Sequence, residues 1–268
     1  MNNIYIKSLL LLFILYVGIT IIIYFYQRKL LYHPDFNSYV TGHGLNEKFE
    51  NINFKTSDNL SLKGWFHLKN LEKKTILFLH GNAGSLDNRI EKLNALSKLD
   101  INILIIAWRG YSSNPGKPTE AGLYKDAEAS IKWLISQGIF EENIILYGES
   151  LGTAVAIHSG QFKKFAGIIL EAPFTSMVDM GKKYYPIFPV RFLLKDKFES
   201  KNKIKNLISP LLVMHGKKDN IVPFYMGENI FKLAKNPKFK YFTDNDDHMM
   251  DFTPDLVKSI EKFIKSLN

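Results

Sequence analysis

The sequence predicts an α/β protein with an open, mostly parallel, doubly wound β-sheet that is attached at its amino terminus to one apolar helix. Short apolar runs alternate along the chain with amphipathic stretches of helical period, as in folds with helices on both faces of a sheet. The apolar runs are continuous, which is typical of strands buried on both faces. One uncharged stretch near the start is long enough to cross a bilayer.

The apolar stretch at residues 8–27 reads SLLLLFILYVGITIIIYFYQ, and no charged residue stands between Lys7 and Arg28. About 20 apolar residues cross the hydrocarbon core, and the tyrosines and basic residues at the end of the stretch suit the membrane interface. A cleavable signal peptide would have a shorter apolar region followed by small residues at a cleavage site, and no such site follows here. We expect residues 1–29 to form an uncleaved single-pass membrane anchor and residues 30–48 a linker.

The charges on either side of the anchor bear on the membrane side of the remaining chain. Arg28 and Lys29 outnumber Lys7, and the positive-inside rule then favours a cytoplasmic domain. The margin is a single charge, so both orientations stay open at this point.

The remaining chain begins with two predicted strands in residues 49–69, joined by a turn at 57–59. Apolar runs bounded by turn residues predict further strands at 75–80, 101–108, 143–148, 165–170, 210–216 and 238–243. Helices are predicted at 253–267 and at 120–137, where one face carries Leu123, Ala127, Ile131 and Leu134. These elements form one α/β domain over residues 49–268.

Residues 174–205 interrupt the alternation with aromatic residues near two prolines and with no strand pattern. Open α/β sheets bind their ligands at the carboxyl ends of the strands, where such an insertion lies. We therefore expect residues 174–205 to form a short cap segment. A structural excursion without a function is the alternative.

Composition limits the classes of function. The net charge of +9 is carried by lysines, with only four arginines and no arginine cluster; nucleic-acid readout favours arginine forks, so we expect no nucleic-acid partner. The absence of cysteine excludes disulfides and thiol catalysis. The sequence has no glycine-rich phosphate loop and no metal-ligand spacing of histidines and carboxylates. We expect no cofactor and no metal ion.

The candidate nucleophile follows the predicted strand at 143–148. Residues 148–152 read GESLG, and a helical stretch starts at Thr153. This succession of strand, sharp turn and helix is what a nucleophile elbow requires. It predicts Ser150 as a nucleophile, against the alternative of an ordinary serine that caps a helix.

Two later strand ends supply an acid and a base. Asp219 follows the run at 210–216, where a carboxylate can orient an imidazole, and His248 follows the last run. The order Ser150, Asp219, His248 is the chain order of α/β-hydrolase triads. Glu171 ends another run and is the competing acid, but its position in the sheet fits the role less well.

An oxyanion hole needs two backbone donors near the nucleophile. One donor is the amide of Leu151, directly after Ser150. The other should come from the loop after an earlier strand. That loop reads HGNAGS at residues 80–85, and we expect the amide of Asn82 to be the second donor.

Several stretches together resemble the membrane-anchored, serine-aminopeptidase-like branch of the α/β-hydrolase superfamily, whose eukaryotic relatives are Bem-type and depalmitoylase-like hydrolases. These stretches are HGNAGS, WRGYSSNPGKPTEAGLYKDA, GESLGTAVAI, EAPFTSMVDM, YPIFPVRFLLKDKF and LLVMHGKKDNIVP. The resemblance runs from about Phe49 to the carboxyl terminus. It implies an amino-terminal anchor and a triad of Ser150, Asp219 and His248, and it leaves the substrate open.

The chain departs from that branch just before its histidine. The branch usually has a small Gly-x-Gly-His-like turn there, whereas this chain reads TDNDDHMM. Asp244, Asp246 and Asp247 lie close to His248 in sequence, and nearby carboxylates favour an imidazolium. Because a general base must be neutral to act, we expect a pH optimum shifted to alkaline values.

The sequence therefore predicts a membrane-anchored serine hydrolase that cleaves an ester, thioester or amide of a small-molecule or lipid-like acyl substrate. An aminopeptidase-like enzyme would share the mechanism but would need an acidic pocket for a free amine, with Glu171 and Asp179 as candidates. A non-enzymatic anchored scaffold with the same fold is the alternative from another class, and it predicts that a triad member is missing. The sequence leaves the oligomeric state open.

Overall fold

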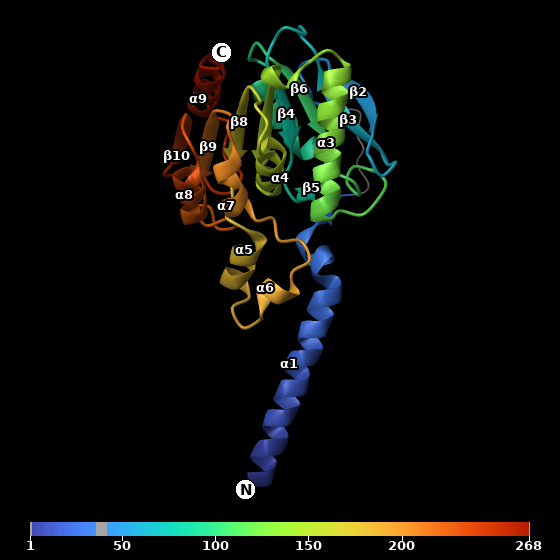
Figure 1. Cartoon of the computed structure of the whole chain (residues 1–268), viewed down its shortest axis with the longest axis vertical. Helices are drawn as coiled ribbons and strands as arrows, with labels where there is room; N and C mark the ends of the chain where they lie inside the picture. The colour runs from blue at the N-terminus through green and yellow to red at the C-terminus, as the bar shows by residue number, and fades with distance from the viewer. Residues whose placement is uncertain (1, 36–41, 268) are drawn as a thin grey trace.

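The computed structural model describes residues 2–35 and 42–267 of the chain. A large β-sheet forms the centre of the molecule, and the long helix α1 (Asn2–Leu31) projects from it at the end opposite the carboxyl terminus (Figure 1). The strands of this sheet are β2 (Glu50–Lys55), β3 (Ser61–His67), β4 (Thr75–Leu79), β6 (Asn102–Ile106), β7 (Ile144–Glu149), β8 (Gly167–Glu171), β9 (Leu211–Gly216) and β10 (Lys238–Thr243). The two strands predicted in residues 49–69 and the six predicted from the apolar runs are confirmed.

The order of the strands across the sheet is β10-β9-β8-β7-β4-β6-β3-β2. The neighbours from β10 to β6 are all parallel, and only the β2–β3 and β3–β6 pairs are antiparallel. The carboxyl ends of six strands therefore meet at one edge of the sheet. The predicted mostly parallel sheet is confirmed.

The helices after α1 pack on both faces of the sheet or follow its carboxyl edge. They are α2 (Ile90–Leu96), α3 (Glu120–Ser136), α4 (Leu151–Gly160), α5 (Met177–Tyr184), α6 (Val190–Leu193), α7 (Ser200–Lys203), α8 (Phe224–Leu233) and α9 (Pro254–Lys265). Short 3-10 turns lie at η1 (Leu86–Arg89), η2 (Glu141–Asn143) and η3 (Ile204–Asn206). The predicted helices at 120–137 and 253–267 correspond to α3 and α9. The predicted cap segment, residues 174–205, contains α5, α6, α7 and η3.

Two separate hydrophobic cores lie on the two faces of the sheet. Along β4, Leu77 and Leu79 belong to the core under α3 and α4, whereas Ile76 and Phe78 belong to the core under α2 and α9. Successive side chains of a strand point to opposite faces, so a strand covered on both sides must be apolar at every position. This explains the continuous apolar runs in the sequence.

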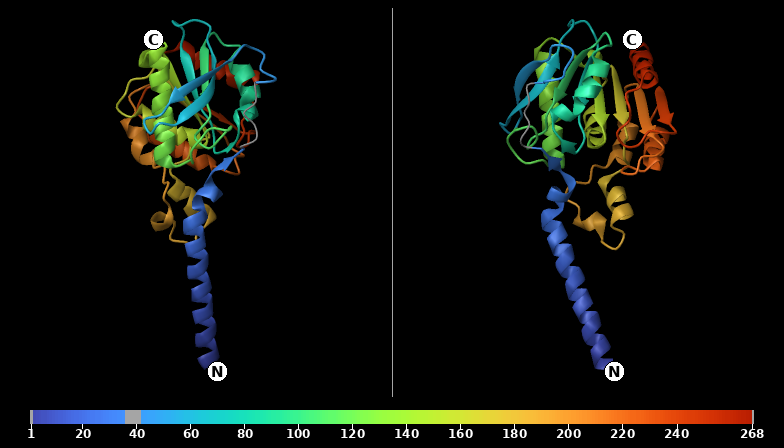
Figure 2. Two further views of the ribbon diagram at one scale, coloured as in Figure 1. Left: turned by 90° about the vertical axis from the view of Figure 1, so that its right-hand side faces the viewer. Right: turned by 180° about the vertical axis from the view of Figure 1, so that it is seen from behind.

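Helix α1 is the one helix in the described part of the chain that is long and apolar enough to cross a membrane. A membrane anchor and a signal sequence both meet this criterion. The carboxyl-terminal half of α1 runs beside α5 and α6 in every view (Figures 1 and 2). Arg28 pairs with the buried Asp196 of the cap segment at 2.8 Å. The helix is therefore tied to the domain by the cap segment as well as by its own connection.

The segment after α1 corrects the expected linker at 30–48. Tyr32 is only 3% exposed, and β1 (His33–Pro34) pairs in parallel with β5 (Ala83–Gly84) in the loop after β4. The amide of Asp35 also donates to the carbonyl of Gly84 at 3.1 Å. Residues 32–35 are thus a packed part of the domain; a two-residue strand is too short to leave a periodic pattern in the sequence. Residues 36–41 of the expected linker lie outside the described residues.

Replacement of Tyr32 by alanine tests whether this segment is structural. Because Tyr32 is 3% exposed, Tyr32→Ala should lower the free energy of unfolding by about 3–5 kcal/mol, as for other buried aromatic side chains. Tyr5→Ala is the matched control, since Tyr5 is 64% exposed on α1. Both variants are unfolded with urea in detergent. Equal unfolding midpoints for the two variants would mean that residues 30–35 are a free linker after all.

Candidate active site

Ser150 lies on a sharp turn between the end of β7 and the start of α4. Its backbone has φ +50° and ψ −111°, a conformation that L-residues rarely adopt and that costs on the order of 1–3 kcal/mol. The turn is fixed by two hydrogen bonds: the Ser150 amide donates to the carbonyl of Glu171 at 2.8 Å, and the hydroxyl of Thr153 donates to the Ser150 carbonyl at 2.6 Å. The strain marks this residue as a candidate functional position.

Both glycines of GESLG are needed because the backbone passes too close for a side chain. A Cβ on Gly152 would lie 1.8 Å from the carbonyl oxygen of Leu79 in β4. A Cβ on Gly148 would lie 2.6 Å from the carbonyl oxygen of Gly152 itself. The motif thus allows α4 to start tightly against the sheet, which leaves Ser150 at the sheet's carboxyl edge.

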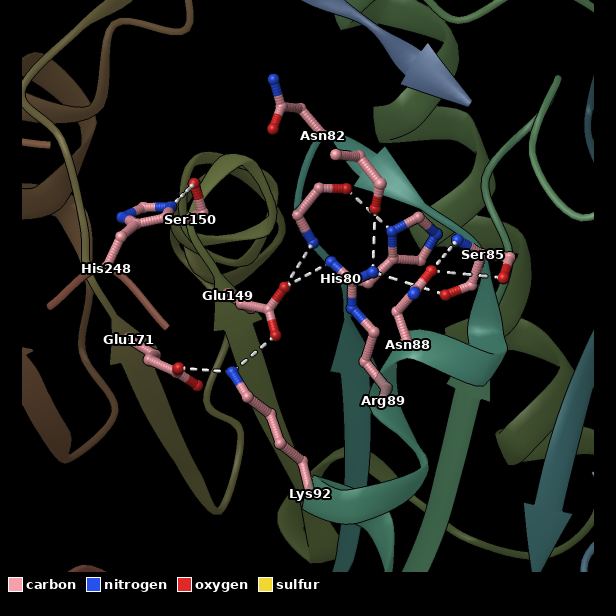
Figure 3. Close-up of polar contacts among 12 residues, drawn as sticks. His80, Asn82, Ser85, Asn88, Arg89, Lys92, Glu149, Ser150, Glu171 and His248 are labelled. Carbon is pink, nitrogen blue, oxygen red and sulfur yellow. Dashed lines mark hydrogen bonds and ion pairs between the residues drawn. The ribbon is translucent and has the colours of Figure 1, made fainter. Parts of the chain in front are cut away.

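The structure brings the three predicted triad residues together. His248 Nε2 lies 3.1 Å from Ser150 Oγ, as Figure 3 shows, and His248 Nδ1 lies 2.8 Å from Asp219 Oδ2. Because an ionised carboxylate only accepts hydrogen bonds, Nδ1 carries the proton and Nε2 is left to accept from the serine hydroxyl. All three residues are at most 9% exposed, so the series is shielded from bulk water.

Besides His248, three further groups hold the carboxylate of Asp219 in place. Its Oδ1 accepts from the amides of Ile221 and Val222 at 2.9 and 2.7 Å. His215 Nε2 lies 3.0 Å from Asp219 Oδ2 and 3.0 Å from the carbonyl of Val222; since both partners are acceptors, this nitrogen carries a proton. Burial would raise the pKa of Asp219, but the hydrogen bonds from His215 and His248 outweigh it and hold that pKa well below its ordinary value.

His215 lies within the strand predicted at residues 210–216, and the sequence does not predict its contact with Asp219. The available signal was its position in β9, four residues before Asp219. The side chain is fully buried and helps to fix the carboxylate that faces His248.

A buried cluster of charges lies directly beneath the turn (Figure 3). Glu149 pairs with Arg89 at 2.6 Å and with Lys92 at 2.8 Å. Lys92 also pairs with Glu171 at 2.5 Å, whose other oxygen accepts from the hydroxyl of Tyr147 at 2.6 Å. We call Arg89, Lys92, Glu149, Glu171 and Tyr147 the buried charge cluster. It joins η1, α2, β7 and β8 under Ser150.

The two glutamates of the buried charge cluster differ in their electrostatics. Burial would raise the pKa of Glu149, but the charges of Arg89 and Lys92 lower it well below its ordinary value. Glu171 pairs with a single cation, Lys92, which also pairs with Glu149. Burial therefore raises the pKa of Glu171 above its ordinary value. Burial would lower the pKa of Lys92, but the two carboxylates together raise it. Lys92 is therefore charged at neutral pH and balances both carboxylates.

The loop at residues 80–85 lies next to the turn of Ser150. In the parallel register Leu79 stands opposite Gly148, so this loop and the Ser150 turn leave neighbouring strands at the same edge. The side-chain amide nitrogen of Asn82 donates to the carbonyl of Leu31 at 2.8 Å, which ties this side chain to the end of α1. The backbone carbonyl of Asn82 accepts from the hydroxyl of Tyr111 at 2.8 Å. Leu151 is the first residue of α4.

The other carboxylates singled out in the sequence have partners elsewhere. Glu171 belongs to the buried charge cluster, and Asp179 pairs with Lys201 at 2.7 Å. Asp244 pairs with Lys217, and Asp247 accepts from the amide of Met249 at 2.9 Å. Asp244 and Asp247 thus each have a partner other than His248, and the alkaline pH optimum expected from Asp244, Asp246 and Asp247 stays a prediction. In residues 2–35 and 42–267, no group of three or more His, Cys, Asp or Glu side chains is placed to hold a metal ion.

Known proteins are similar to this chain over most of its length. The family profile described as alpha/beta hydrolase fold matches residues 74–199. Rv2307c of Mycobacterium tuberculosis is 34% identical over 82% of this chain and 80% of its own, and bem46 of Schizosaccharomyces pombe is 31% identical over 82% and 78%. The solved esterase Pf2001 of Pyrococcus furiosus is 20% identical, has a TM-score of 0.71, and matches over 88% of this chain and 99% of that chain.

Removal of the cation in the buried charge cluster should be costly. Lys92→Met leaves Glu149 and Glu171 buried with less compensation, and such changes cost about 3–5 kcal/mol of folding free energy. Lys132→Met is the matched control, because Lys132 pairs with Glu128 on the exposed face of α3, where a pair contributes about 0.5 kcal/mol or less. The measurement is the urea midpoint of each variant. Similar midpoints for both variants would contradict a structural role of the cluster.

The pKa of Asp219 makes a prediction about acid stability. Because its pKa is lowered in the folded state, the ionised carboxylate adds stability above the unfolded-state pKa of about 4 and loses it as the pH falls through the folded-state pKa. Asp219→Asn should therefore be less stable than the wild type at pH 7, with a gap that shrinks below about pH 4. Urea unfolding between pH 7 and 3 measures this gap, with Asp251→Asn on the exposed loop as control. A stability difference between Asp219→Asn and the wild type that does not change with pH would contradict the lowered pKa of Asp219.

Proposed function

The chain belongs to the α/β-hydrolase family, and from this premise we propose that it is a membrane-anchored serine hydrolase that cleaves a carboxylic ester, thioester or amide. The observation that carries the proposal is the hydrogen-bonded series Ser150, His248 and Asp219 at the carboxyl edge of the sheet. Its order along the chain matches that of α/β-hydrolase triads.

In the proposed mechanism, Ser150 Oγ attacks the carbonyl carbon while His248 Nε2 takes the hydroxyl proton. Asp219 holds the imidazole in the required tautomer and stabilises the imidazolium. His248 then returns the proton to the leaving alcohol, thiol or amine, and an acyl-enzyme remains. A water molecule gives a proton to His248 and attacks the acyl carbon. As the bond between this carbon and Ser150 Oγ breaks, His248 returns the proton to Oγ and the carboxylic acid leaves.

The negative charge on the tetrahedral intermediate needs donors that are already in position. We assign this role to the backbone amides of Leu151 and Asn82. Leu151 opens the ten-residue helix α4, so the positive end of the helix dipole adds to its amide. The loop of Asn82 is fixed by its bonds to Leu31 and Tyr111. Loss of one such donor typically costs about 10²–10³ in rate.

Membrane attachment is the second part of the proposal. It is supported by the length and apolar composition of α1, and by its contacts with the domain, which a cleaved signal sequence would not need. The flanking charges favour a cytoplasmic domain, as argued from the sequence.

The contacts of the acidic residues favour an acyl substrate over a peptide with a free amine. An aminopeptidase-like pocket needs a carboxylate without a partner, but Glu171 pairs with Lys92 and Asp179 with Lys201. The purely structural alternative, an anchored scaffold, predicts a missing triad member, whereas all three side chains are present and in contact.

Labelling by a fluorophosphonate probe tests the nucleophile. The full-length protein in detergent should be labelled at Ser150, and Ser150→Ala should lose both the label and at least about 10³-fold of its rate on short acyl esters. Ser159→Ala, a serine at the other end of α4, is the matched control and should behave as wild type. Absence of labelling in the wild type, or equal labelling of Ser150→Ala, would refute the proposal.

A further inference from the structure

An apolar cavity of about 170 Å³ lies between the end of α1 and the cap segment. The walls include Ile23, Leu30 and Leu31 of α1 and Met177, Met180 and Val190 of the cap segment. A cavity of similar size lined by apolar side chains stays dry and binds small hydrocarbons such as benzene. The cavity therefore suits a section of hydrocarbon chain.

The one amide side chain in the wall of the cavity has no free hydrogen-bonding group to offer a polar ligand. Gln27 Nε2 donates to the carbonyls of Tyr24 and Leu193 at 2.8 and 3.0 Å. Its Oε1 accepts from the amide of Lys195 at 2.7 Å. Because a buried polar group without a partner is costly, a peptide or sugar would lose hydrogen bonds on entering, whereas a hydrocarbon would not.

The cavity is built by fixed contacts on both sides. At its domain end, Arg28 pairs with Asp196. Further along α1, Tyr16 stacks on Phe188 with ring centroids 5.6 Å apart, and its hydroxyl donates to the carbonyl of Ile187 at 2.9 Å. The turn between α5 and α6 thus follows α1 back as far as Tyr16, and the two views of Figure 2 show these segments together.

The cavity lies where the carboxyl-terminal end of the proposed membrane span meets the domain that carries the candidate active site. Its wall at Leu31 is bonded to Asn82 of the loop beside Ser150. Met177, another residue of the cavity wall, is the first residue of α5, and α5 follows β8 along the chain. The last residue of β8 is Glu171, whose backbone carbonyl accepts a hydrogen bond from the Ser150 amide. The other end of α1 extends away from the domain (Figure 1). Ile187, between α5 and α6, and Phe192, in α6, are 71% and 86% exposed, so this part of the cap segment presents apolar side chains at its surface.

We propose that this cavity binds the acyl chain of a long-chain ester or thioester that enters from the bilayer, with its carbonyl carbon directed to Ser150. This inference rests on the proposed function and narrows it to substrates with long acyl chains. The apolar lining, the occupied amide of Gln27 and the position beside α1 favour this occupant over a peptide segment.

Chain-length selectivity tests the proposal. The full-length protein in mixed micelles is assayed with nitrophenyl butyrate and palmitate, and the ratio of their kcat/KM values is compared among variants, so that the presentation of each ester cancels. Met180→Trp in α5 and Leu194→Trp directly after α6 fill the cavity from two separate segments. Each should lower the palmitate-to-butyrate ratio by at least about 10-fold, since a filled cavity excludes the distal part of the chain.

Phe140→Trp is the control for the introduced indole. Phe140 is 52% exposed and precedes β7 at the amino edge of the sheet, away from the candidate site. It should keep the wild-type ratio. A ratio that stays at the wild-type value in both filled variants, or one that falls equally in Phe140→Trp, would overturn the acyl-chain cavity.

The two proposals fail in distinguishable ways. If the protein is labelled by the fluorophosphonate and hydrolyses butyrate, but the palmitate-to-butyrate ratio is unchanged in the filled variants, only the acyl-chain cavity is rejected. No labelling and no turnover of either ester would overturn the proposed function and the cavity with it. Turnover of amino-acid amides in preference to both esters would also reject an acyl-chain substrate while keeping the nucleophile.

Discussion

The ion pairs of Lys92 with Glu149 and Glu171 are the constraint on which the rest of the site depends. Buried charges are tolerated only when they are paired with good geometry, so α2, β7 and β8 cannot shift independently of one another. The carbonyl of the same Glu171 accepts from the amide of Ser150. The cluster thus holds the unfavourable backbone of Ser150 in place, and the strained turn persists because its surroundings over-determine it.

The sequence predicts the sheet well because each strand carries its own signal. A strand buried on both faces is apolar at every position. The residues that follow each apolar run therefore lie at the carboxyl edge of the sheet, where open α/β sheets bind their ligands. Ser150, Asp219 and His248 could be predicted in this way. The buried charge cluster could not, because the partners of Lys92 lie 57 and 79 positions away. Nothing in the local pattern distinguishes these charges from solvated ones. The contact of His215 with Asp219 was missed because its strand position favours a core role.

The short connection after α1 bonds the end of this helix to the loop beside Ser150. Leu31, the last residue of α1, accepts from Asn82, and β1 pairs with β5 two residues later. An anchor on a flexible linker would leave the domain free to rotate against the bilayer. A connection bonded to the loop beside Ser150 instead fixes the carboxyl edge of the sheet toward the side from which α1 extends. Helix α1 and the α/β domain are therefore better described as coupled than as separate units.

The choice of substrate follows from which polar groups are left without a partner. Recognition of a free amine needs an unpaired carboxylate, and recognition of a polar chain needs unpaired donors or acceptors. Around the cavity, Gln27 bonds to the backbone on both of its amide atoms, and Asp196 pairs with Arg28. In the proposed acyl-chain cavity, binding energy would come mainly from buried apolar area, at roughly 0.8 kcal/mol for each buried methylene. The proposed acyl-chain cavity would therefore discriminate by chain length, with the polar interactions made by the carbonyl group at the candidate nucleophile, Ser150.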